Sequence, residues 1–177
     1  MNVIFDNWVI RLVGKVSKYD LKKIFENNET AILLGDDTYW TEAFLLCVKS
    51  FTNDVEFLVA VCSDIVLEPS IISHKKNDLL IIGFNNDIVA IDLNIAKVAS
   101  SKQLGSPFYF AKFIENRIIV ITEIGVFALT DELKEIFYQP TNLVESFRFM
   151  ENELIIITES EARTIDIFYT PTTTPDA

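Results

Sequence analysis

The sequence has a single histidine, two cysteines and only five glycines among its 177 residues. One histidine, His74, and two cysteines, Cys47 and Cys62, cannot build a zinc finger or a zinc ribbon. No glycine-rich phosphate loop, Gly-x-Ser-x-Gly elbow or His-Glu-x-x-His pattern is present either. We therefore expect no metal, no cofactor and no enzymatic activity, and two reduced thiols.

Cationic side chains are also scarce. The chain has 15 Lys and Arg against 26 Asp and Glu, so its formal net charge is −11. Binding to phosphates or to anionic membranes requires cations. The composition therefore predicts no direct contact with nucleic acid or with a membrane, and it favours a basic protein as partner.

Long apolar runs are missing as well. The longest aliphatic stretches, at 78–84 and 117–121, are far too short to cross a bilayer. The first residues contain neither a basic segment nor an apolar run of signal-peptide length. The expected location is therefore the cytoplasm.

Branched aliphatic and aromatic residues are abundant, with 50% hydrophobic residues and 14 Phe. Short runs rich in Ile and Val alternate with small polar turns such as Asn53-Asp54 and Asn85-Asn86, which is typical of antiparallel hairpins. One short helix is predicted at 19–27, where Leu21 falls on an apolar face and Ser17 or Asp20 can cap the N-terminus. We expect one β-rich domain over 1–169 and a flexible tail at 170–177, where no core residue occurs.

An internal repeat organises the second half of the chain. Residues 113–123 read FIENRIIVITE and residues 149–159 read FMENELIIITE, at an offset of 36 residues. A weaker copy, HKKNDLLIIGF, occupies 74–84. Such a repeat predicts stacked sheets over about 70–169, in which Phe113 and Phe149 hold equivalent positions.

Two further segments carry a resemblance to a known fold. VFALTDELKEIFY, from Val126, and IVAIDLNIAKV, from Ile88, resemble the inner hairpin of quinoprotein-type or WD-type β-propeller blades. The glycine and tryptophan that dock quinoprotein blades are missing, so the resemblance implies no cofactor. Three blades cannot close a ring, because propellers typically have about four to eight, and residues 1–69 either add a fourth sheet or leave the array open. The expected fold is all-β, with antiparallel sheets in an open or incomplete propeller-like array and one short N-terminal helix.

Glutamates recur with the repeat. Glu123 and Glu159 occupy the same position after a Thr, and equivalent positions in stacked repeats lie along one rim. Together with Glu161 they form the first candidate binding site for a partner, and Asp36 and Asp37, beside Tyr39-Trp40, form the second. The alternatives are that these carboxylates only confer solubility, or that Asp36-Asp37 serves an enzyme that uses paired carboxylates.

Two functional interpretations follow. A small, acidic chain with no catalytic motif resembles bacterial immunity proteins, including those of contact-dependent growth inhibition. That resemblance implies a protein that neutralises a basic toxin, usually a nuclease, by covering its cleft with acidic side chains. The alternative is a propeller-like scaffold or adaptor subunit of a larger assembly.

Overall fold

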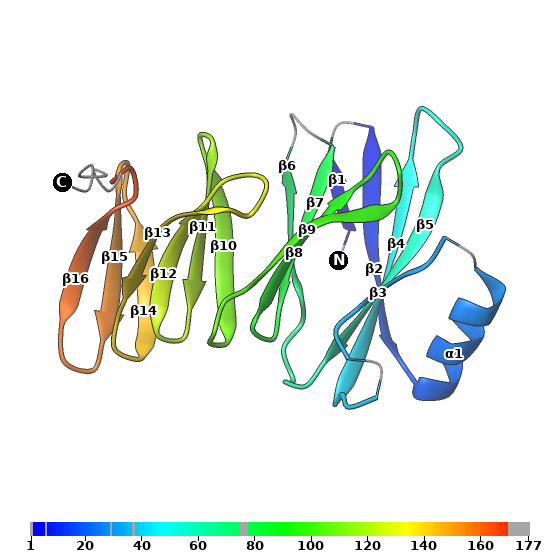
Figure 1. The fold of residues 1–177 in the computed structure, drawn as a ribbon, viewed down its shortest axis with the longest axis horizontal. Coiled ribbons are helices and arrows are strands. Elements are labelled where there is room, and N and C mark those ends of the chain that lie inside the picture. Colours follow the sequence, from blue (N-terminus) through cyan, green and yellow to red (C-terminus); the bar gives the residue numbers. More distant parts are fainter. Residues whose placement is uncertain (1, 6, 29, 37, 75–77, 170–177) are drawn as a thin grey trace, which may run out of the picture.

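The computed structural model describes residues 2–5, 7–28, 30–36, 38–74 and 78–169, which form four β-sheets and one α-helix (Figure 1). Strands make up 59% of the structure. The prediction of an all-β fold with one short helix is therefore confirmed. The candidate residue Asp37 and the predicted tail at 170–177 lie outside the described residues.

Sheet A is built from the first third of the chain, so residues 1–69 do supply a fourth sheet. Its strand order is β1-β2-β4-β5-β3, and β3 pairs with β5 in parallel whereas the other pairs are antiparallel. The strands are β1 (Asn2–Phe5), β2 (Trp8–Val16), β3 (Ile32–Leu34), β4 (Glu42–Ser50) and β5 (Glu56–Ser63). Cys47 lies opposite Leu58 and Cys62 lies opposite Ala43, so the two thiols are not neighbours across the hairpin, and no disulfide joins them.

Helix α1 (Lys18–Asn27) covers the outer face of sheet A. Ser17 caps it, because its Oγ accepts a hydrogen bond from Asp20 N at 3.2 Å. The buried Leu21 packs against Ala43 and Ala60 of the sheet. The predicted helix is thus confirmed, with one additional residue at its start.

Sheets B, C and D are consecutive antiparallel meanders. Sheet B contains β6 (Ser70–His74), β7 (Leu79–Phe84), β8 (Asp87–Asp92) and β9 (Lys97–Gln103). Sheet C contains β10 (Phe108–Ile114), β11 (Arg117–Thr122), β12 (Gly125–Leu129) and β13 (Glu135–Pro140), and sheet D contains β14 (Val144–Phe149), β15 (Glu153–Thr158) and β16 (Ala162–Asp166).

The strand register confirms the repeat. His74 pairs with Leu79 in sheet B, Phe113 pairs with Ile118 in sheet C, and Phe149 pairs with Leu154 in sheet D. The first strands of sheets C and D also carry a bulge at the same repeat position, after Phe108 and after Val144. The equivalence of Phe113 and Phe149 therefore holds in three dimensions.

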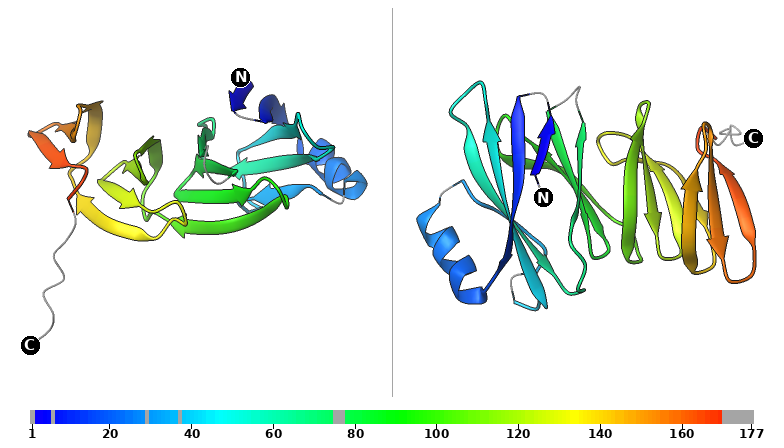
Figure 2. Two further views of the ribbon diagram at one scale, coloured as in Figure 1. Left: turned by 90° about the horizontal axis from the view of Figure 1, so that it is seen from above. Right: turned by 180° about the vertical axis from the view of Figure 1, so that it is seen from behind.

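The sheets pack face to face in a curved row that does not close (Figure 2). Three apolar cores fill the spaces between A and B, between B and C, and between C and D. Both faces of β7, β8, β11 and β12 are buried as a result. A continuous aliphatic run suits such a strand, because neither of its faces contacts water.

One hydrogen bond recurs where each sheet meets the next. Phe108 N donates to Asn85 O at 2.6 Å, and Val144 N donates to Glu123 O at 2.8 Å. In each case the first strand of a sheet is attached to the central turn of the preceding sheet. These bonds fix the spacing of sheets B, C and D at one end of the array.

Asn85 also connects sheet B to sheet A. Its Oδ1 accepts hydrogen bonds from Ser63 Oγ at 2.6 Å and from Asp64 N at 3.2 Å. Its backbone has φ +46°, a left-handed conformation that Asn tolerates better than most residues do. This one residue therefore joins three sheets.

We predict that Asn85→Gly lowers the free energy of unfolding by about 1–3 kcal/mol, because Asp64 N loses its acceptor while glycine keeps the positive φ. Asn86→Gly, at the exposed neighbour, is the control for the flexibility that glycine adds. Urea denaturation measures both variants. Equal losses in the two variants would show that the Asn85 side chain does not link the sheets.

Candidate binding surface

The repeated glutamates lie in the central turns of sheets C and D. Glu123 is in the turn between the paired residues Thr122 and Gly125, and Glu159 directly follows Thr158 in the turn between β15 and β16. Phe108 pairs with Thr122 and donates its N–H to Asn85 O, and Val144 pairs with Thr158 and donates its N–H to Glu123 O. The central turns of sheets B, C and D therefore lie at the same end of the array. The rim predicted from the sequence is therefore present in the geometry.

Further carboxylates from all four sheets lie at this end. Asp64 and Asp36 follow the parallel strands β5 and β3, Asp87 begins β8, and Glu145 is in the bulge of β14. We call this set the acidic rim: Asp36, Asp64, Asp87, Glu123, Glu145, Glu159 and Glu161. From the sequence, Asp36 and the repeat glutamates are two separate candidate sites, whereas the structure places them at the same end of the array.

Buried threonines hold the turns of the rim. Thr122 Oγ1 donates to Gly125 O at 3.1 Å, and Thr158 Oγ1 donates to Glu161 O at 3.2 Å. Each buried hydroxyl thus donates a hydrogen bond to a backbone carbonyl at its turn. The recurring Ile-Thr-Glu sequence therefore has a structural reason: threonine fixes the turn that presents the glutamate.

Asp36 is constrained by its own loop. Its Oδ1 accepts hydrogen bonds from Thr38 N at 2.7 Å and from Tyr39 N at 3.3 Å, and these backbone donors lower the pKa of the carboxyl. The neighbouring Tyr39 is 80% exposed. Trp40, by contrast, packs with the apolar residues beneath α1. Of the two aromatic residues considered as anchors, only Tyr39 is available to a partner.

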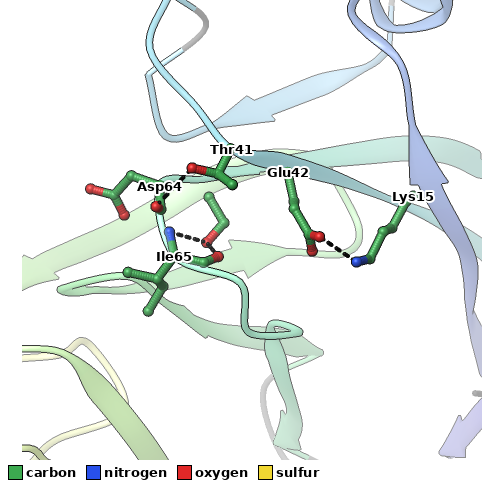
Figure 3. Close-up of polar contacts among 6 residues, drawn as sticks. Lys15, Thr41, Glu42, Asp64 and Ile65 are labelled. Atoms are coloured by element: carbon green, nitrogen blue, oxygen red, sulfur yellow. Dashed lines mark hydrogen bonds and ion pairs between the residues drawn. The ribbon is translucent and has the colours of Figure 1, made fainter.

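Several cations at this end of the array already have partners, and Lys18 Nζ donates to Thr38 O at 3.1 Å while Arg163 Nη1 donates to Pro140 O at 3.5 Å. Lys15 forms an ion pair with Glu42 at the start of β4, near the point where Thr41 Oγ1 donates to Asp64 O at 3.0 Å (Figure 3). Within the part of the chain that the structure describes, no ion pair involves Glu123, Glu159 or Glu161. These carboxylates are therefore open to a cationic partner.

Two groups on the rim have raised pKa values to which burial and a neighbouring carboxylate both contribute. The pKa of Asp87 is raised, first by burial and then by the nearby charge of Asp64. The pKa of Tyr109 is raised by burial and by Glu123. A bound cation would relieve the repulsion between the Asp64 and Asp87 carboxylates.

The rim does not have the geometry of a metal centre. Among the described residues, no group of three or more His, Cys, Asp or Glu side chains could hold a metal ion. The spread of the carboxylates over four sheets suits an extended protein surface better than a small ligand. The structure also contains, in its described ranges, no helix long and apolar enough to cross a membrane.

Comparisons with known proteins define the fold. No protein-family model matches the chain, and no curated protein matches it. A similar solved structure is dihydro-heme d1 dehydrogenase NirN in complex with DHE, with a TM-score of 0.53 and 9% identity over 71% of this chain and 32% of that chain. BamB from Moraxella catarrhalis gives a TM-score of 0.49 and 12% identity over 89% of this chain and 49% of that one.

These similar structures are propeller-type proteins. The chain spans about a third to a half of the length of the solved structures that it matches. At such low identity the similarity to NirN shows the fold alone. It confirms the propeller-like repeats and leaves the resemblance to immunity proteins without support.

We predict that Asp87→Asn raises the free energy of unfolding at pH 7. A carboxyl whose pKa is raised by folding destabilises the folded state as the pH rises through the carboxyl range, and Asn removes that charge. The gain should be about 0.5 kcal/mol or less, because the side chain stays partly hydrated. It should vanish below about pH 3, where the Asp87 carboxyl is protonated in both states.

Urea denaturation at several pH values measures this difference. Asp54→Asn, at the exposed β4–β5 turn, controls for the loss of one negative charge elsewhere. A gain that is equal for both variants, or that persists in acid, would contradict a repulsion specific to Asp87.

Proposed function

We propose that the protein is a non-catalytic, propeller-like scaffold that binds a basic partner protein along its acidic rim. The observation that supports this proposal most directly is the rim itself, where seven carboxylates from four sheets share one end of the array. A net charge of −11 extends the same negative field beyond the contact surface.

Rigidity of the rim favours binding. The turns that carry Glu123 and Glu161 are held by backbone bonds and by threonine hydroxyls. A preorganised surface loses little conformational entropy when a partner docks. The partner can therefore align Lys and Arg side chains with carboxylates that project from ordered turns.

Charge should affect the two rate constants differently. Attraction over long distances accelerates the encounter, so the association rate should fall as salt is added. Dissociation should depend on the few carboxylates that become buried against cations of the partner.

A narrower candidate is an immunity protein that blocks a basic toxin nuclease. The rim favours it, because nucleases bind phosphates with cationic clefts that a row of carboxylates can cover. Nuclease activity distinguishes this candidate from a general scaffold. The free partner must degrade nucleic acid, and the partner bound to this protein must not.

We predict that the triple variant Glu123→Lys, Glu159→Lys and Glu161→Lys weakens partner binding by about 30-fold or more, as expected when buried charge pairs are broken. The matched control reverses Asp54, Glu132 and Glu151 to Lys, which changes the net charge equally at the opposite end of the sheets. Partners captured by the wild-type protein are identified by mass spectrometry, and their rate constants are then measured by surface plasmon resonance at several salt concentrations.

Equal weakening in both triple variants would show that only net charge matters, and unchanged affinity in the rim variant would place the interface elsewhere. A nuclease assay on the captured partner, with and without each variant, decides between a general scaffold and an immunity protein.

A further inference from the structure

Sheet D ends one strand earlier than its neighbours. Sheets B and C each finish with a fourth, outer strand, β9 and β13, whereas the strand order of sheet D stops at β16. Among the described residues, nothing pairs with the outer edge of β16. This edge lies at the far end of the row of sheets (Figure 1).

The ladder between β15 and β16 defines which backbone groups are free. Thr158 N donates to Glu161 O at 2.9 Å, and bonded and non-bonded pairs alternate along an antiparallel ladder. Arg163 and Ile165 therefore turn their N–H and C=O groups toward β15. Ala162 and Thr164 turn theirs outward, where an added strand would find them.

A groove runs beside this edge, between β13 and β16. Its volume is about 450 Å³, and its apolar lining includes Ile136, Phe137, Tyr138, Ile165 and Tyr169. In sheet C the equivalent place beside β12 is occupied by β13 itself. The groove thus lies where the fourth strand of sheet D would run.

Charge indicates what kind of strand fits. At the end of β8, Asp92 accepts a hydrogen bond from Asn94 N at 2.9 Å and lies opposite Lys97 of β9. At the end of β16, Asp166 makes the same turn with Phe168 N at 2.8 Å, yet its cross-strand neighbour is Glu153. Like charges opposite one another are unfavourable, so a cation on the open side of Asp166 would stabilise the sheet.

We propose that β16 and the adjoining groove bind an extended segment of a partner protein, which pairs antiparallel with β16 and places Lys or Arg opposite Asp166. Main-chain hydrogen bonds to Ala162 and Thr164 supply affinity, and the groove accepts apolar side chains of the segment. Residues 170–177 are a poor occupant, because Pro171 and Pro175 lack N–H groups and no large apolar side chain occurs among them. The surface is separate from the interface proposed on the acidic rim.

The test uses a peptide that already acts as a fourth strand in this protein. A fluorescein-labelled peptide of residues 95–104, IAKVASSKQL, contains β9 and two lysines. Fluorescence anisotropy should show saturable binding to the full chain with Kd below about 1 mM. No binding at that concentration would overturn the proposal.

Thr164→Pro removes one outward N–H and leaves the bonds of Arg163 and Ile165 to β15 in place, so it should raise the Kd at least about tenfold. Thr164→Val keeps the N–H and should bind as the wild type does. Equal binding by Thr164→Pro and Thr164→Val would overturn the proposal, provided that circular dichroism shows both to be folded.

Two further measurements do not depend on the folding of the proline variant. Asp166→Asn keeps an oxygen acceptor for the turn, and this variant should bind the peptide more weakly than the wild-type protein does. A peptide with Lys97→Glu should in turn bind more weakly to the wild-type protein. No change in either case would overturn the proposed charge pairing. A peptide with prolines at Val98 and Ser100 should not bind, and its binding would overturn strand addition.

Other occupants would also be detected. A dimer in analytical ultracentrifugation that Thr164→Pro converts to a monomer would show that a second copy occupies the edge, which overturns the partner proposal. A rise of about tenfold or more in peptide affinity on deletion of 170–177 would show that those residues occupy the groove. The experiment does not involve the acidic rim, so its failure leaves the rim proposal intact.

Discussion

The structure depends on one constraint: an aliphatic β-sheet must cover both of its faces. Sheets B and C meet it by packing between neighbours, and their central strands are buried on both sides. Sheet A meets it with sheet B on one face and helix α1 on the other. At about 25 cal/mol for each Å² of apolar surface removed from water, this stacking is the main force that assembles the array.

The polar end of the array follows from the stacking. Each sheet begins beside the central turn of the preceding sheet, through the bonds from Phe108 N to Asn85 O and from Val144 N to Glu123 O. Because the turns are attached in series, charged residues within them become neighbours although they are far apart in the sequence. In this way the charge of Asp64, which follows sheet A, helps to raise the pKa of Asp87 in sheet B.

The features that could be predicted from the sequence are those that depend on residues close together in the chain. The repeat predicted the register of Phe113 and Phe149, the cap at Ser17 predicted α1, and the position of Glu123 and Glu159 predicted the rim. Contacts between distant residues could not be predicted, such as Ser63 Oγ to Asn85 Oδ1 and the parallel pairing of the three-residue strand β3 with β5. Neither contact leaves a periodic signal in the sequence. For that reason only the structure reveals that Asp36 and Asp64 belong to the acidic rim.

Sheet D shows what happens when the constraint is not met. Ile119 and Ile121 of β11 are completely buried, whereas their repeat equivalents in β15 are only half-buried, at Ile155, or exposed by 39%, at Ile157. The sequence of β15 therefore keeps the aliphatic character of an interior strand, although the described residues leave its outer face partly exposed. Covering a large aliphatic side chain contributes about 1.5–3 kcal/mol, so this face stabilises any contact that closes over it. Glu161 directly precedes Ala162, so the acidic rim and the free edge of β16 adjoin at one corner. The two surfaces nevertheless offer different groups, because the rim presents side-chain carboxylates whereas the edge presents backbone N–H and C=O groups beside apolar side chains.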